Sequence, residues 1–132
     1  MRIGELAKQA GVSPRTLRYY ESRGLLPDHR AANGYRVYDS GDLRLVKQIR
    51  ALQEFGFDLE ETRPFVECLR AGYPAGDSCP DSLDVYRGKL AELDALIGRL
   101  RTVRAEVEAQ LARAEAQLSD ASEPQCERGG GR

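Results

Sequence analysis

A run of apolar residues spaced alternately by three and four positions constrains this fold more than any other feature. Ten of its eleven positions are apolar, and Arg104 is the exception. The positions are Leu83, Tyr86, Leu90, Leu93, Ile97, Leu100, Arg104, Val107, Leu111, Ala114 and Leu118. Such a heptad repeat is typical of a coiled coil, and a helix over residues 80–118 would be about 58 Å long. A small chain cannot bury so long a seam alone, so the pattern predicts a second copy as partner.

The remaining length leaves room for one compact domain. The net charge of −1 over 132 residues is unevenly distributed. Residues 1–50 hold ten Lys and Arg against five Asp and Glu, whereas residues 51–132 hold ten against sixteen. A basic N-terminal part can attract a polyanion such as nucleic acid. Because no apolar run could cross a bilayer and the N-terminus lacks a signal-peptide pattern, we expect a cytoplasmic protein without membrane contact.

Two short helical patterns meet at a glycine near the N-terminus. The first has its apolar residues at helical spacing, namely Ile3, Leu6, Ala7 and Ala10. Gly11 can end that helix in a left-handed conformation, Ser13 is a favourable N-cap, and Pro14 suits the first position of the next helix. We expect the second helix to end near Ser22. Helix, tight turn and helix together indicate a helix-turn-helix.

The second of these helices has the features of a recognition helix. Its spacing places Leu17 and Tyr20 toward the core and leaves the cationic face outside. The residues predicted to contact DNA from this helix are Arg15, Thr16, Arg18 and Tyr19. Arginine can bind guanine edges bidentately or clamp a phosphate, and the major groove accepts such a helix.

A wing is predicted after this helix. Asn33-Gly34 is a strong turn signal, and residues 35–38 alternate and favour β structure, so we expect a hairpin with residues 27–31. The wing residues predicted to contact DNA are Arg30, Tyr35, Arg36 and Tyr38. Strand alternation places Tyr35 and Tyr38 on opposite faces, so at least one of these aromatics should pack in the core.

Two further helices complete the predicted domain. Asp39 or Ser40 should cap a third helix that ends at Gly56, and Asp58 with Glu61 has capping-box spacing for a fourth. The predicted organisation is a DNA-binding domain at 1–69, a Gly- and Pro-rich linker at 70–79, a dimerisation helix at 80–118 and a disordered tail at 119–132. The predicted fold is mainly α, with a winged helix-turn-helix and a small β wing.

The cysteines and the single histidine argue against a disulfide framework and a self-contained zinc site. Cys68 is predicted to pack in the fourth helix, and Cys126 lies in the tail. Cys79 directly precedes the long helix, whose positive end favours a thiolate that binds soft metals or reacts with oxidants. No catalytic triad, paired-carboxylate cleft or phosphate-binding loop is present in the sequence, so we do not expect an enzyme.

In combination these segments resemble the MerR family of bacterial transcription regulators. The matching segments are Ile3-Gly4-Glu5-Leu6-Ala7, Gly11-Val12-Ser13, Arg15-Thr16-Leu17-Arg18-Tyr19-Tyr20-Glu21, Gly24-Leu25-Leu26, Asn33-Gly34-Tyr35-Arg36-Val37-Tyr38, Asp42-Leu43-Arg44-Leu45 and Gly56-Phe57-Asp58-Leu59. The resemblance implies a homodimer joined by an antiparallel coiled coil and bound to a near-palindromic promoter site. It also implies an activator that bends and untwists an overlong promoter spacer for RNA polymerase.

The resemblance leaves the input signal open. In the family's metal sensors a residue at the position of Cys79 contributes to the metal site, but their two later cysteines have no counterpart in residues 114–120. The open inputs are a thiol-directed signal at Cys79 with Cys68, a metal ion at Cys79 shared across a dimer, a small molecule at the helix junctions, or none. Two alternative functions are an effector-independent architectural DNA-binding protein and a coiled-coil adaptor.

Overall fold

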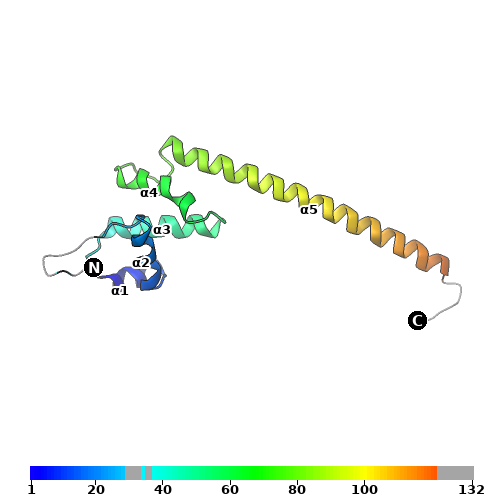
Figure 1. Ribbon diagram of the computed structural model, residues 1–132, viewed down its shortest axis with the longest axis horizontal. Helices are drawn as coiled ribbons and strands as arrows, with labels where there is room; N and C mark the ends of the chain where they lie inside the picture. The colour runs from blue at the N-terminus through cyan, green and yellow to red at the C-terminus, as the bar shows by residue number, and fades with distance from the viewer. Residues whose placement is uncertain (29–33, 35–36, 122–132) are drawn as a thin grey trace. The chain divides into compact units, whose positions relative to one another are not determined.

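The computed structural model describes residues 1–28, 34 and 37–121, and these are mainly helical (Figure 1). The elements are α1 (Ile3–Ala10), α2 (Pro14–Ser22), α3 (Ser40–Glu54), the 3-10 helix η1 (Glu60–Thr62), α4 (Arg63–Arg70) and α5 (Pro80–Ala121). The mainly α prediction is therefore confirmed. No strand occurs among the described residues, so the predicted β wing is not confirmed. None of the described helices could span a membrane.

Residues Met1–Lys89 form one of two compact units, and its main core joins α1, α2 and α3. The fully buried side chains at its centre are Leu6, Leu17, Leu25, Leu26, Val46 and Ile49. Gly11 ends α1 with φ 72°, a left-handed conformation that suits glycine. This turn lets α2 pack against α1 within the core.

Two capping boxes fix the helices that follow the wing segment. At the start of α3, the Asp39 side chain accepts a hydrogen bond from the Asp42 backbone N–H, and the Asp42 side chain accepts one from Asp39. Asp58 and Glu61 exchange the same pair of bonds, at 2.8 and 2.9 Å. The predicted cap at Asp39 is confirmed. The Asp58–Glu61 pair forms as predicted but leads into η1, and α4 begins at Arg63 without a side-chain cap, which corrects the predicted start of the fourth helix.

A second, aromatic cluster seats the first turns of α5 in the same unit. The rings of Phe57, Phe65 and Tyr86 meet edge to face, with centroids 5.1 to 6.3 Å apart. Lys89 is buried beside them. Its Nζ donates to the carbonyl oxygen of Gly56 at 3.1 Å and lies 5.1 Å from the Phe57 ring centroid. Tyr86 thus packs within its own domain, which corrects its assignment to the seam between two copies.

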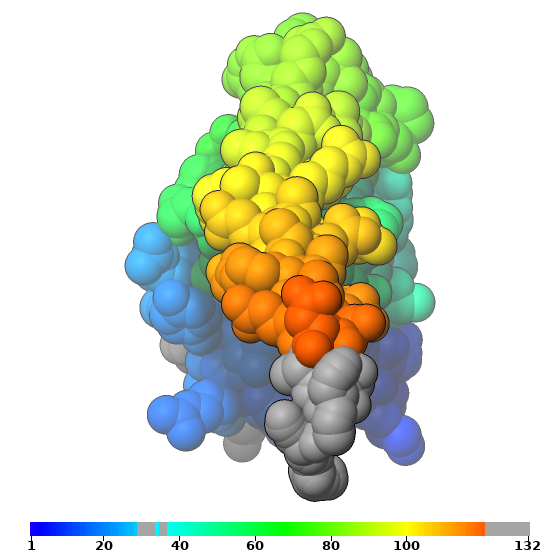
Figure 2. All heavy atoms as spheres, turned by 90° about the vertical axis from the view of Figure 1, so that its right-hand side faces the viewer, coloured from blue at the N-terminus to red at the C-terminus, as the bar shows by residue number. Residues whose placement is uncertain are grey.

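The second unit begins at Leu90 and contains the rest of α5. The helix reaches Ala121, three residues beyond the predicted end at 118. All residues from 90 to 120 are exposed, and Figure 2 shows their side chains in yellow to orange at the molecular surface. The large apolar residues among them are Leu90, Leu93, Leu96, Ile97, Leu100, Val103, Val107, Leu111 and Leu118. Every predicted seam position from Leu90 to Leu118, Arg104 included, is therefore exposed in the single chain.

Candidate DNA-binding interface

The predicted recognition helix α2 has one buried face and one exposed face. The Ser13 side chain accepts a hydrogen bond from the Thr16 backbone N–H at 3.1 Å, and Pro14 occupies the first turn. Leu17 and Tyr20 are buried, as predicted. The Tyr20 hydroxyl donates to Gln53 Oε1 at 3.0 Å, which fastens α2 to α3. Burial raises the pKa of Tyr20, so this hydroxyl remains a donor at neutral pH.

The exposed face of α2 carries the predicted contacts. Arg15 and Arg18 are exposed, and Tyr19 is 52% exposed. Within the described part of the chain, neither guanidinium group makes a hydrogen bond or ion pair. Thr16 is half-buried, and its Oγ1 lies 3.0 Å from Ser13 Oγ. The structure therefore brings two free guanidinium groups and one aromatic ring to one face of the helix.

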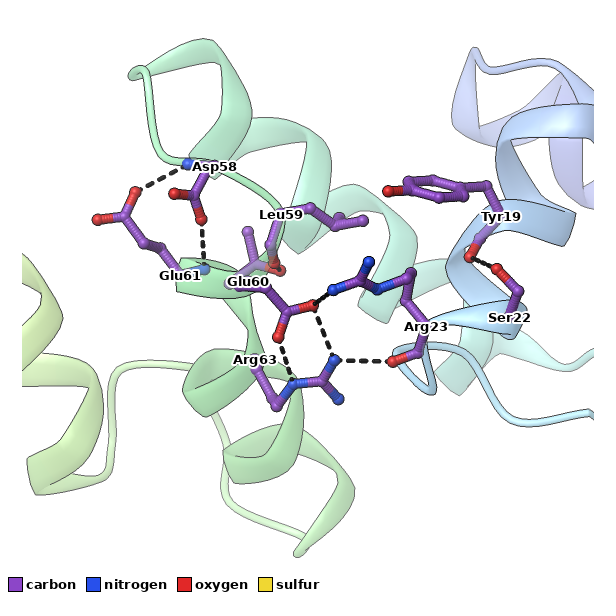
Figure 3. Close-up of polar contacts among 9 residues, drawn as sticks. Tyr19, Ser22, Arg23, Asp58, Leu59, Glu60, Glu61 and Arg63 are labelled. Atoms are coloured by element: carbon purple, nitrogen blue, oxygen red, sulfur yellow. Dashed lines mark hydrogen bonds and ion pairs between the residues drawn. The ribbon is translucent and has the colours of Figure 1, made fainter.

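An ion-pair network holds the end of α2 against η1 and α4 (Figure 3). Glu60 accepts from Arg23 at 2.7 Å and from Arg63 at 3.0 and 3.1 Å. Arg63 also donates to the Arg23 carbonyl oxygen at 2.7 Å. Its hydrogen bonds to Arg63 and then Arg23 lower the pKa of Glu60, so the carboxylate stays ionised. The sequence did not predict this network because Arg23 lies 37 residues from Glu60 and 40 residues from Arg63.

Tyr38 was predicted to contact DNA from the wing, but the structure buries it. Its side chain is 2% exposed, and its hydroxyl donates to the Glu21 carboxylate. Its backbone exchanges hydrogen bonds with Met1, at 2.6 and 2.7 Å. Tyr38 is therefore a wing aromatic that packs in the core, as predicted for at least one of the two. The other predicted wing contacts, Arg30, Tyr35 and Arg36, lie outside the described residues.

The two predicted sensor cysteines are joined to each other. Cys68 in α4 and Cys79 before α5 form a disulfide, with Cα atoms 6.0 Å apart. This corrects the expectation that the cysteines form no structural bridge. Cys68 is buried, as predicted. Among the described residues, no group of three or more His, Cys, Asp or Glu side chains comes together as a metal site.

A pocket lies close to this disulfide. It has a volume of about 370 Å³ and lies between α3 and residues 74–76, with Arg44 and Lys47 in its lining. The Arg44 guanidinium donates to the carbonyl oxygen of Pro74 at 2.8 Å. The segment between the two cysteines is thereby tied to α3.

Comparisons with known proteins agree with this arrangement. Residues 1–67 match the family profile described as "MerR HTH family regulatory protein", and residues 43–110 match "MerR, DNA binding". The transcriptional regulator ZntR of Escherichia coli (strain K12) is 36% identical over 104 residues, which are 78% of this chain and 72% of ZntR. The transcriptional regulator HmrR of Rhizobium leguminosarum bv. viciae is 35% identical over 109 residues, 82% of this chain and 81% of HmrR.

A solved structure extends the likeness to the fold. The regulator PbrR691 from Ralstonia metallidurans CH34, crystallised with lead(II), is 31% identical. The match covers 97% of this chain and 90% of PbrR691, with a TM-score of 0.55. The two profiles together reach from residue 1 to residue 110. The chain therefore belongs to the MerR family of DNA-binding transcriptional regulators, which are not enzymes.

Proposed function

We propose that this regulator works as a homodimer that activates transcription from a near-palindromic promoter site. The observation that carries the proposal is the outer face of α2, where Arg15 and Arg18 have no partner among the described residues. A helix that presents free guanidinium groups is suited to the major groove, because arginine can read guanine or clamp phosphate there.

The exposed stripe of α5 supports the dimer. Large apolar side chains recur from Leu90 to Leu118, each at least 37% exposed. Burying such a side chain contributes about 1.5–3 kcal/mol, so leaving the whole stripe in water is costly. A second copy offers the same heptad spacing and can cover the stripe as an antiparallel coiled coil.

The proposed output is a change in DNA shape. The two recognition helices of one dimer would bind the two half-sites within an overlong promoter spacer. If the dimer bends and untwists that spacer, RNA polymerase can engage both promoter elements at once. In this proposal the protein activates transcription by stabilising a deformed duplex. The relative orientation of the two DNA-binding domains in the dimer then determines whether the duplex is deformed.

Transcription in vitro tests this proposal directly. The templates are the promoter region upstream of the chain's own gene, the same promoter with its spacer shortened to ordinary length, and a version with the inverted repeat scrambled. We expect the regulator to raise transcription only from the first template, because the shortened spacer needs no deformation and the scrambled site does not bind. Equal activation of all three would contradict the proposal, and reduced transcription from the first would make the protein a repressor.

A further inference from the structure

Two cysteines meet where the chain passes from α4 to α5. Cys68 is 3% exposed within α4, and Cys79, the residue before α5, is half-buried. The Cα–Cα distance of 6.0 Å lies within the range of ordinary disulfides. We propose that Cys68 and Cys79 are a reversible dithiol–disulfide pair, which links the start of α5 covalently to α4 when oxidised and leaves it held by non-covalent contacts alone when reduced.

The segment between the two cysteines is held in place by contacts other than the disulfide. The buried Ser82 hydroxyl donates to the carbonyl oxygen of Gly76 at 2.6 Å. The Tyr86 hydroxyl donates to Asp77 Oδ2 at 2.9 Å, and the Arg44 guanidinium binds the Pro74 carbonyl. Because none of these contacts involves a sulfur atom, we expect them to keep the two thiols near each other after reduction. The bond can therefore form again without refolding of the domain.

The location of the pair decides what its oxidation changes. Cys68 lies on the helix that Arg63 joins to the end of the recognition helix. Cys79 lies at the start of the helix proposed to form the dimer. An effect of the redox state on promoter transcription therefore rests on the proposed function. With the disulfide formed, the connection at 69–78 is closed into a short loop; without it, only non-covalent contacts limit its opening.

The chemistry needs a two-electron oxidant, and a peroxide supplies it. The Cys79 thiolate, the more exposed of the two, attacks a peroxide oxygen and the O–O bond breaks. The leaving hydroxide takes up the proton that the thiol had released, so the products are a sulfenic acid and water. The Cys68 sulfur then attacks the sulfenic sulfur, forms the S–S bond and releases a second water. The two thiols together lose two electrons and two protons. A dithiol reductant reverses the reaction by thiol–disulfide exchange.

Peptide mapping of the full chain tests the reversible bond. The folded protein is treated with hydrogen peroxide or dithiothreitol, acid-quenched, alkylated and cut with trypsin. Cleavage after Arg70 and Arg87 places the cysteines in separate peptides, which a disulfide holds together. We expect linked peptides after peroxide, separate ones after dithiothreitol, and linked ones again after a second oxidation. The control Cys126→Ser should behave like the wild type, whereas Cys68→Ser and Cys79→Ser should never give the linked pair.

Amide hydrogen exchange tests whether the bond fastens the connection. We expect exchange in residues 71–79 to become roughly tenfold faster, or more, after reduction of the wild type, because loop closure is lost. Exchange in Cys79→Ser should be fast under both conditions. Absence of the linked pair, reduction only after denaturation, or equal exchange in both redox states would each overturn the proposal.

Promoter transcription supplies the last comparison. We expect transcript levels to differ between oxidised and reduced wild type and to stay constant in Cys79→Ser. Equal transcription in both states of a DNA-bound wild type would leave the bond without a regulatory role and overturn that part of the proposal. If neither state binds the promoter, the proposed function fails, while the peptide map and the exchange rates still decide the redox pair.

Discussion

At the scale of single residues, Arg18 tests whether the exposed face of α2 reads sequence. It lies one turn after Arg15, opposite the buried Leu17 and Tyr20. We expect Arg18→Ala to weaken operator binding by about 1–3 kcal/mol, since a bidentate contact to a base is lost. Fluorescence anisotropy with labelled operator measures the affinity.

The matched control for Arg18 is Arg99→Ala, an exposed arginine of the second unit. It should leave operator affinity unchanged, and sedimentation should show the same oligomeric state for both variants. Equal affinities of Arg18→Ala and the wild type would remove Arg18 from the recognition face.

Gly76 tests the packing around the two cysteines. It is buried, and a Cβ atom there would lie 2.5 Å from Gln48 Oε1 and 3.2 Å from the Phe65 Cβ. We expect Gly76→Ala to lower the free energy of unfolding by about 1–3 kcal/mol, because Phe65 is in a packed core and cannot retreat. Urea denaturation measures the change.

Gly88 is the control for Gly76, because a side chain at Gly88 has space around it. It lies within α5, and a Cβ atom added there would meet no other side chain or element within 4 Å. Gly88→Ala should therefore raise stability by about 0.5–1 kcal/mol through helix propensity. A Gly76→Ala variant as stable as the wild type would show that the segment at 74–76 can move away from α3.

Some residue roles were predictable from the sequence and others were not. Helical periodicity correctly placed Leu17 and Tyr20 inside, and Arg15 and Arg18 outside. Strand alternation predicted that at least one wing aromatic would be buried. It did not single out Tyr38, because the burial of Tyr38 depends on Met1 and Glu21, which lie far from it in sequence. The burial of Lys89 had no local signal either, since its partners Gly56 and Glu61 belong to another element.

At the scale of elements, the Glu60 network joins α2 to α4, and its strength should depend on pH. The pKa of Glu60 in the folded protein is below the ordinary value of 4.5, because Arg63 and then Arg23 favour the carboxylate. Its contribution to stability is therefore complete above about pH 4.5 and is lost as the pH falls through the folded-state pKa.

The variant Glu60→Gln measures this contribution. At pH 7 its urea midpoint should lie below that of the wild type, and the difference should shrink as the pH is lowered below 4.5. Because all three side chains are substantially exposed, we expect a small effect that added salt reduces. A difference that stayed constant with pH would assign the loss to packing instead of charge.

The apolar stripe of α5 tests the proposed dimer. Leu100 is 68% exposed and lies in the heptad seam. Leu100→Glu places two carboxylates in the proposed dimer interface and removes two leucines from it. We expect the dimer dissociation constant to rise about a hundredfold or more, measured by sedimentation. Ala109→Glu, exposed and outside the seam, is the control, and equal loss in both would contradict a heptad interface.

The elements also differed in how well the sequence predicted them. The helices were predictable because caps and periodicity are local signals, as at Ser13, Asp39 and Asp58. The heptad pattern predicted α5 but assigned Tyr86 to the seam, whereas in the structure Tyr86 is partly buried against Phe57 and Phe65. A repeat of apolar residues predicts which face of a helix is buried. It does not predict whether another copy or the same domain covers that face. The Cys68–Cys79 bridge was missed for a similar reason, since the turn at 71–78 determines its geometry.

At the scale of the whole molecule, the two halves of the chain have opposite net charge. The excess of cations lies in residues 1–50, which include α2, and the acidic excess lies in the part that contains α5. An acidic dimerisation helix would not bind DNA by itself, so the basic domains should direct the orientation of the protein on the duplex. In the proposed dimer every phosphate contact occurs twice, once at each half-site.

Because each contact occurs twice, the effect of one substitution on the salt dependence of DNA binding can be calculated. Each phosphate neutralised by a cation contributes about 0.9 to the slope of log K against log salt concentration. Arg15 lies in the first turn of α2, where the positive end of the helix dipole also favours phosphate. Arg15→Ala should therefore reduce the slope by about two for the dimer and weaken binding to all sequences alike. The dimer-disrupting Leu100→Glu should show roughly half the wild-type slope on a single half-site, because only one domain is then bound. If Arg15→Ala leaves the slope unchanged, Arg15 does not neutralise a phosphate. If Leu100→Glu and the wild type have equal slopes, the two DNA-binding domains do not bind together.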